Sequence, residues 1–127
     1  MGSLHSMNKE EFVNFVKMHI RDEASAGLIQ KLEKPPGRKP RAKLVAQSKW
    51  FNNLDSKDKE MVSQIIHESI DEALFGLLSV LDGVSAIYEK PGSEWKLIYK
   101  NKDQEKLLND IETESLHDLY NDLTLED

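Results

Sequence analysis

One long apolar stripe in the second half of the chain constrains the fold more than any other feature. Within residues 57–82, apolar side chains recur at the spacing of an α-helix, in which successive residues turn by about 100°. A stripe this wide is typical of a helix that lies deep in a protein, so we predict a buried central helix over about 57–82. Gly83 is expected to end it, because glycine adopts the left-handed conformation at little cost. The stripe consists of Val62, Ile66, Ile70, Ala73, Leu74, Leu77, Val80 and Leu81.

Two shorter helices are predicted near the N-terminus. Asn8 and Glu11 have the spacing of a capping box, and the apolar pattern behind them predicts a helix over 9–23. Ser25 is a candidate N-cap of a second helix, which the prolines that follow residue 34 must end because they lack an amide donor.

Two further helical patterns follow the prolines. One predicts a third helix that ends near Asn52, with Trp50 and Phe51 as large contributors to the core. Ser56 is a candidate N-cap of the central helix. The other pattern predicts one or two short amphipathic helices within 107–123.

Two short segments rich in β-branched and aromatic residues predict a hairpin. They cover residues 84–89 and 94–99 and are separated by a Lys-Pro-Gly-Ser turn. The predicted fold class is therefore α+β and mostly α: four or five helices around the central helix, with one antiparallel hairpin over about 84–100.

The length and composition limit the number of domains and the classes of chemistry. A chain of 127 residues fits one domain, so we expect a single globular domain over 7–127 and interpret residues 1–6 as a cloning remnant. The lack of cysteine excludes a thiolate zinc site and a cysteine nucleophile, and it suits a reducing cytoplasm. No apolar run approaches the ~20 residues that cross a bilayer. We therefore expect a cytoplasmic protein without a membrane span, and we expect no cofactor.

The charges are unevenly distributed along the chain. Residues 31–49 contain seven Lys or Arg against one acid, a balance of +6, whereas residues 103–127 contain nine acids against one Lys, a balance of −8. Within the basic tract, residues 34–41 include three prolines and a glycine, so we expect them to form an exposed loop. Opposed blocks of this kind predict mutual attraction or two recognition surfaces.

Acidic and histidine side chains near the middle of the central helix raise the question of a metal or acid-base site. His67 and Asp71 are i, i+4 neighbours on one helix face, and His117 with Asp118 is the only comparable pair. Together these four residues could hold a divalent ion in a metal-dependent enzyme. Their spacing matches no specific metal motif, so the solvated flank of a helix is the favoured interpretation.

The basic loop admits three interpretations: a solvated loop, a surface for an acidic protein, or a surface for nucleic acid through Arg38, Lys39 and Arg41. Nucleic acid is disfavoured because the chain carries a net charge of −6 and no aromatic residue is interleaved with the basic ones. Elsewhere, Asp82 is expected either to lie in a cleft or to accept hydrogen bonds from amides near the helix end, and the second role is favoured.

Three segments carry a resemblance: Leu74-Phe-Gly-Leu-Leu-Ser-Val-Leu-Asp-Gly-Val84, the strand Trp95–Tyr99 and Leu116-His-Asp-Leu-Tyr120. Over about 50–123 the chain resembles small uncharacterised bacterial domains with a helix that ends in Leu-Asp-Gly, a hairpin and a Leu-His-Asp segment. Such domains are similar in size and acidity to immunity proteins of bacterial toxin systems. The resemblance implies no catalytic residue.

The favoured function is non-catalytic protein binding of the immunity or accessory type. The acidic C-terminal surface, with Asp118, Asp122 and Glu126, is expected to bind a basic protein partner, because complementary potentials speed association. The oligomeric state stays open.

Overall fold

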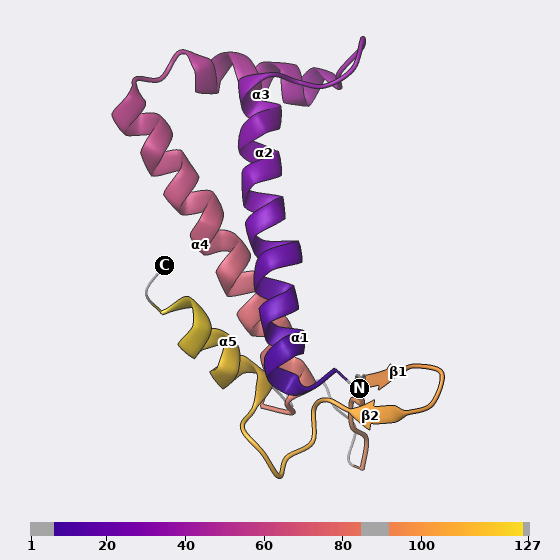
Figure 1. Ribbon diagram of the computed structural model, residues 1–127. Coiled ribbons are helices and arrows are strands. Elements are labelled where there is room, and N and C mark those ends of the chain that lie inside the picture. The colour runs from indigo at the N-terminus through magenta and orange to yellow at the C-terminus, as the bar shows by residue number, and fades with distance from the viewer. Residues whose placement is uncertain (1–6, 85–91, 126–127) are drawn as a thin grey trace. The chain divides into compact units, whose positions relative to one another are not determined.

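The computed structural model describes residues 7–84 and 92–125 (Figure 1). Its contacts group the chain into two compact units, which we call the middle unit, Met18–Glu72, and the terminal unit, Met1–Lys17 with Ala73–Asp127. The expectation of a single domain over 7–127 stays a prediction. The fold class is α+β and mostly α, as predicted from the sequence. None of the helices in the described segments is long and apolar enough to cross a membrane.

The N-terminal helices differ from the prediction in how they are joined. Helix α1 (Lys9–Val16) has the predicted capping box, since the Asn8 side chain accepts from the Glu11 amide and Glu11 accepts from the Asn8 amide. A π-helical turn (Lys17–Asp22) then leads directly into helix α2 (Glu23–Glu33). The predicted break before Ser25 is wrong: Asp22 already has helical dihedral angles, so Ser25 lies buried inside α2 instead of capping it.

In the middle unit, α2 packs against helix α3 (Ala42–Asn52), whose end agrees with the prediction. Helix α2 ends as expected, because Lys34 precedes a proline and takes an extended conformation. The Asn52 amide donates to the carbonyl oxygens of Leu32 and Glu33, at 3.3 and 3.1 Å, and so joins the end of α2 to α3. Phe51 is 2% exposed, as predicted, but Trp50 is 59% exposed, so its expected place in the core is wrong.

Helix α4 (Ser56–Leu81) confirms the predicted long helix within a residue at each end. Asp55, and not Ser56, caps it by accepting from the Asp58 amide at 2.8 Å. At the other end Gly83 has φ 79°, and the amides of Gly83 and Val84 donate to the Val80 and Ser79 carbonyl oxygens. This is the Schellman arrangement, which satisfies the last carbonyls of a helix.

The predicted deep burial of α4 is wrong. Only Leu78 and Ser79 are buried, and Leu77, which belongs to the predicted stripe, is 55% exposed. Residues 56–72 of α4 belong to the middle unit and 73–81 to the terminal unit, so the two halves have different neighbours. The apolar stripe in the sequence was drawn over the whole of α4. It therefore does not identify the face that is buried near the end of the helix, which is centred on Leu78.

The hairpin exists but lies further along the chain than predicted. Strand β1 (Ile98–Lys100) pairs antiparallel with strand β2 (Glu105–Leu107), and Tyr99 lies opposite Lys106. The Asn101 side chain accepts from the Asp103 and Gln104 amides and holds the turn. Most of the predicted first strand, within 84–89, lies outside the described residues. Of the predicted second strand, 94–99, only Ile98 and Tyr99 lie in a strand, and the partner strand Glu105–Leu107 carries no apolar pattern because two of its three residues are charged.

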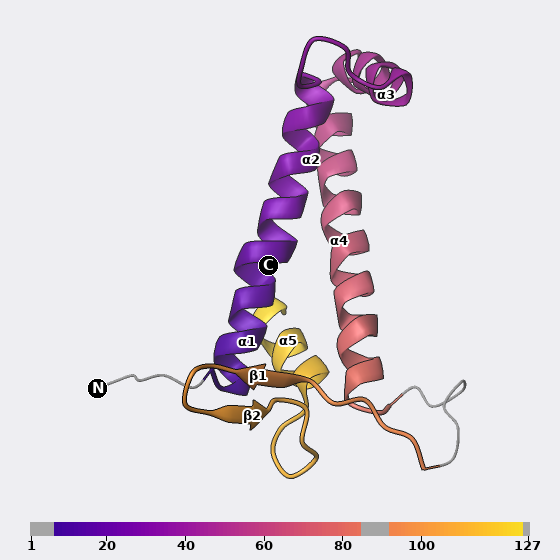
Figure 2. The same cartoon turned by 90° about the vertical axis from the view of Figure 1, so that its right-hand side faces the viewer.

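The core of the terminal unit joins three helices. Helix α5 (Leu116–Thr124) begins at the N-cap Ser115 and packs against α1 (Figure 2). It is the only helix described within the 107–123 region, where one or two were predicted. The core consists of Val13, Val16, Leu78, Leu116 and Tyr120, with Phe12, Leu74, Leu81, Leu97 and Leu119 packed around it.

Candidate partner-binding site

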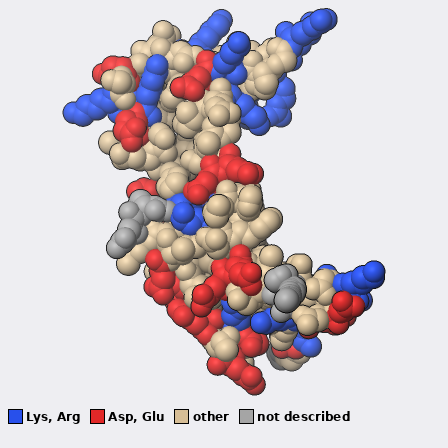
Figure 3. All heavy atoms as spheres, in the orientation of Figure 1, with Lys and Arg blue, Asp and Glu red and all other residues tan. Residues whose placement is uncertain are grey.

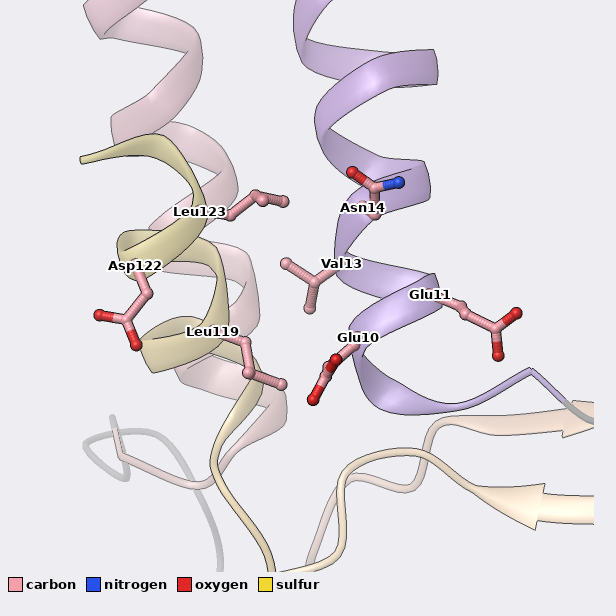
Figure 4. A pocket seen from close by; sticks show the side chains of 7 residues that line it. All are labelled: Glu10, Glu11, Val13, Asn14, Leu119, Asp122 and Leu123. Atoms are coloured by element: carbon pink, nitrogen blue, oxygen red, sulfur yellow. The ribbon is translucent and has the colours of Figure 1, made fainter. Parts of the chain in front are cut away.

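A groove with an apolar floor runs between α1 and α5 in the terminal unit. Val13, Leu119 and Leu123 point toward one another between the two helices, and Glu11 and Asp122 point outward on the two flanks (Figure 4). Glu10 and Asn14 complete the lining, and the groove has a volume of about 520 Å³. Leu123 is 40% exposed, so part of the apolar floor is open to solvent. The site therefore offers a partner both apolar contact area and carboxylates.

The position of the groove follows from the faces of α5. Leu116 and Tyr120, four residues apart, turn into the core, and Leu119 and Leu123 repeat the same spacing on an adjacent face. The core of the terminal unit does not fully cover that second face. The amphipathic pattern in the sequence indicated a helix here, but it did not show which leucines would stay open.

The acidic side chains around the groove repel one another. The pKa of Glu114 is raised above its ordinary value of 4.5 by partial removal from water, by a hydrogen bond between its carboxyl group and that of Asp122, and by the charges of Asp122, Asp118 and Glu10. The terminal unit as a whole contains 14 acids against seven Lys or Arg, a balance of −7. Figure 3 shows red carboxylates gathered over this part of the molecule.

Lys9, which lies close to these acids, is held by contacts of its own. It is buried, it forms an ion pair with the Asp110 carboxylate, and it donates to the carbonyl oxygens of Asp110 and Glu114 at 2.8 and 3.0 Å. The hydrogen bond from Lys9 lowers the pKa of Asp110. The stabilisation from this pair is therefore present above the ordinary pKa of Asp110 and is lost as the pH falls through its lowered value.

Asp82 joins the end of α4 to the start of α5. Its side chain is 3% exposed and accepts hydrogen bonds from the Leu116 and His117 amides, at 3.1 and 2.8 Å, and from His117 Nδ1 at 2.6 Å. These amides belong to the first turn of α5, where no intrahelical acceptor exists and a carboxylate is favoured. Asp82 therefore has a structural role, and it serves the amides of another helix rather than those of its own turn.

We expect Asp82→Ala to lower the free energy of unfolding by about 3 kcal/mol, because two amides and an imidazole lose a charged acceptor in a nearly buried place. Chemical denaturation followed by circular dichroism measures this. Asp103→Ala, which removes an exposed acid in the hairpin turn, is the matched control and should change the stability by less than about 0.5 kcal/mol. Equal effects of the two changes would refute the role of Asp82.

The four residues of the predicted metal site are divided between the two units. His67 and Asp71 belong to the middle unit, and His117 and Asp118 to the terminal unit. Asp71 accepts from the Arg21 guanidinium at 2.9 and 3.3 Å, and His67 Nδ1 lies 3.4 Å from Ser25 Oγ. Within residues 7–84 and 92–125, no group of three or more His, Asp and Glu side chains is placed to hold a metal ion. The enzyme hypothesis stays an untested prediction that gains no support from this geometry.

The predicted partner-binding residues are placed as follows. Asp122 lines the groove, and Asp118 is exposed on the first turn of α5, where its carboxylate accepts from Ser115 Oγ at 2.8 Å. Glu126 lies outside the described residues. Arg38, Lys39 and Arg41 are exposed in the loop between α2 and α3, as expected.

Arg21 is a residue that sequence reasoning missed. It lies in the π-helical turn, is 1% exposed, and pairs with Asp71 and Asp22. A buried arginine with two carboxylate partners is a tertiary feature, and no local pattern connects residues 50 positions apart. We interpret it as an internal anchor of the middle unit.

Comparison with protein families, with curated proteins and with solved structures finds no match to this chain.

Proposed function

We propose that this chain is a non-catalytic protein-binding module of the immunity or accessory type, and that it binds a basic protein partner through the acidic groove between α1 and α5. The proposal rests on one observation: the partly exposed Leu123 and the carboxylates of Glu10, Glu11 and Asp122 line the same groove. The partner segment would be amphipathic, with apolar side chains against Val13, Leu119 and Leu123 and with Lys or Arg facing Glu10 and Asp122.

The two kinds of contact have different roles in such a complex. Burial of apolar area contributes about 25 cal/mol per Å² before the entropic and desolvation costs of association are subtracted, and the carboxylates speed the encounter and disfavour acidic competitors. A cation placed near Glu114 and Asp122 would also relieve their mutual repulsion. A basic nuclease toxin is the class of partner that the immunity-type resemblance implies.

Binding should be coupled to the ionisation of Glu114. The raised pKa of Glu114 means that its ionised form is disfavoured in the free protein, and a basic partner favours that form. Binding should therefore release protons near the pH at which Glu114 titrates, and it should weaken as the pH falls toward 4.5 and below. Titration calorimetry in two buffers of different ionisation enthalpy measures the released protons, and Glu114→Gln should reduce them. Proton uptake on binding would contradict this mechanism.

Affinity purification with quantitative mass spectrometry tests the proposed function. Asp118→Asn, Asp122→Asn and Glu126→Gln combined should abolish capture of the partner, and raised salt should do the same to the native chain. The matched control combines Asp103→Asn, Glu105→Gln and Glu112→Gln, which removes the same charge from the same unit but leaves α5 intact. If both triple variants capture the same partner, or if salt has no effect, the acidic surface of α5 is not the binding site.

A further inference from the structure

The outer face of α3 combines an exposed tryptophan with exposed cations. Trp50 is 59% exposed, and Lys43, seven residues earlier, lies within about 20° of the same direction around the helix. Ala46 lies between them and is also exposed, while the opposite face, with Ser48 and Phe51, is buried. The indole is therefore presented to solvent on the side of α3 away from the core.

The cations around this face have no charged partner within the described residues. All seven Lys and Arg side chains of residues 31–49 are exposed, and none of them takes part in an ion pair or a side-chain hydrogen bond within the described segments. Glu33 is the one acid in this stretch. Figure 3 shows blue side chains projecting around this part of the middle unit. The seven residues are Lys31, Lys34, Arg38, Lys39, Arg41, Lys43 and Lys49.

We propose that this surface, the α3 face with the adjoining loop 34–41, binds single-stranded nucleic acid. The cations would neutralise successive phosphates and release their counterions, and one unpaired base would stack on Trp50. Single strands are favoured over duplexes because stacking on a side chain requires a base that is not already stacked in a helix. This inference goes beyond the proposed protein binding and does not depend on it, because its residues lie in the other unit.

The surroundings of Trp50 favour a nucleic acid over an acidic protein. The centre of a protein interface is typically a cluster of apolar anchors, whereas the exposed neighbours of Trp50 on α3 are Lys43, Ala46, Gln47 and Lys49. A single exposed indole surrounded by cations is typical of surfaces on which bases of a single strand stack. The net charge of the whole chain opposes this binding only weakly, since charges further away than about 8–10 Å are screened at physiological salt.

Fluorescence titration tests the proposal directly. Trp95→Phe leaves Trp50 as the one tryptophan, and its emission should be quenched by an oligo-dT or oligo-U strand with an affinity that falls as salt rises. In the native background, followed with a labelled strand, Trp50→Leu should weaken binding about 5- to 150-fold, and Trp50→Phe should restore part of the loss. Arg38→Ala, Lys39→Ala and Arg41→Ala combined should weaken binding and reduce its salt dependence. Circular dichroism checks that each variant is folded.

Two competitors decide between the possible ligands. A duplex of the same length should bind more weakly than the single strand, and polyglutamate should neither quench Trp50 nor displace the strand at equal charge. If polyglutamate binds as tightly as the strand, the surface serves acidic proteins and the proposal is wrong. Lack of quenching, or equal binding of strand and duplex, overturns it as well.

Discussion

Replacing Leu78 with Ala should lower the free energy of unfolding by about 3 kcal/mol, whereas Leu77→Ala should cost less than about 1 kcal/mol. Leu78 is 1% exposed and packs against Val13 and Leu116, so its truncation leaves a cavity in the core of the terminal unit. Leu77 is the preceding residue on the same helix and has the same side chain, but more than half of it is already in contact with water. Urea denaturation of both variants measures the difference.

The two leucines form a matched pair. Both substitutions replace leucine with alanine, and the two residues are neighbours in α4. The predicted ratio therefore depends only on which leucine faces the core. If Leu77→Ala proves as costly as Leu78→Ala, the buried face of α4 is not the one centred on Leu78, and the packing of the terminal unit described above is wrong.

In the middle unit, Phe51→Ala should be destabilising by about 4 kcal/mol, and Trp50→Ala by less than about 1 kcal/mol, although tryptophan loses the larger side chain. Phe51 is buried on α3, which packs on α2, and the Lys59 ammonium lies 5.7 Å from the centre of its ring. Hydrogen exchange should show lost protection of the amides in α2 and α3 for Phe51→Ala.

The expected result for Trp50 runs against the rule that larger aromatic residues contribute more to a core, and for that reason it is informative. A large loss of stability in Trp50→Ala would place the indole in a core. It would also remove the basis for a nucleic-acid surface on α3.

Sequence patterns predicted the helix ends best, because the residues at these ends act locally. Asn8 with Glu11 begins α1, the prolines after Lys34 end α2, and Gly83 ends α4, each through its own backbone or side-chain chemistry. The continuous path through the π-helical turn was not predicted because Ser25, a candidate N-cap in the sequence, lies inside a continuous helical segment.

Burial could be predicted only in part, because it depends on neighbours that are distant in the sequence. The apolar pattern included Leu77 and omitted Leu78, although the core of the terminal unit uses Leu78. Phe51 and Trp50 are adjacent aromatic residues on α3, yet only Phe51 is buried. The Asp82 contacts with α5 and the ion pair of Arg21 with Asp71 join residues far apart in the chain, so no local spacing could reveal them.

The sequence predicts the acidic part of the candidate site, and the structure adds the groove beside it. The excess of acids after residue 103 predicted an acidic surface that includes Asp118 and Asp122. The groove beside it needs α1 as a second wall, and α1 lies at the other end of the sequence. The basic tract is equally visible in the sequence, but the sequence pattern places Trp50 in the core, whereas the structure leaves it 59% exposed.

The central claim, that a basic partner docks between α1 and α5, is tested most directly by amide chemical shifts of the isotope-labelled chain. The probe is an amphipathic Lys/Leu peptide, followed by the captured partner once it is identified. We expect shifts concentrated at the groove-lining residues of α1 and α5, with Leu123→Ser and raised salt each reducing them. Shifts confined to the hairpin or to residues 31–50, with the groove unperturbed, would contradict the claim.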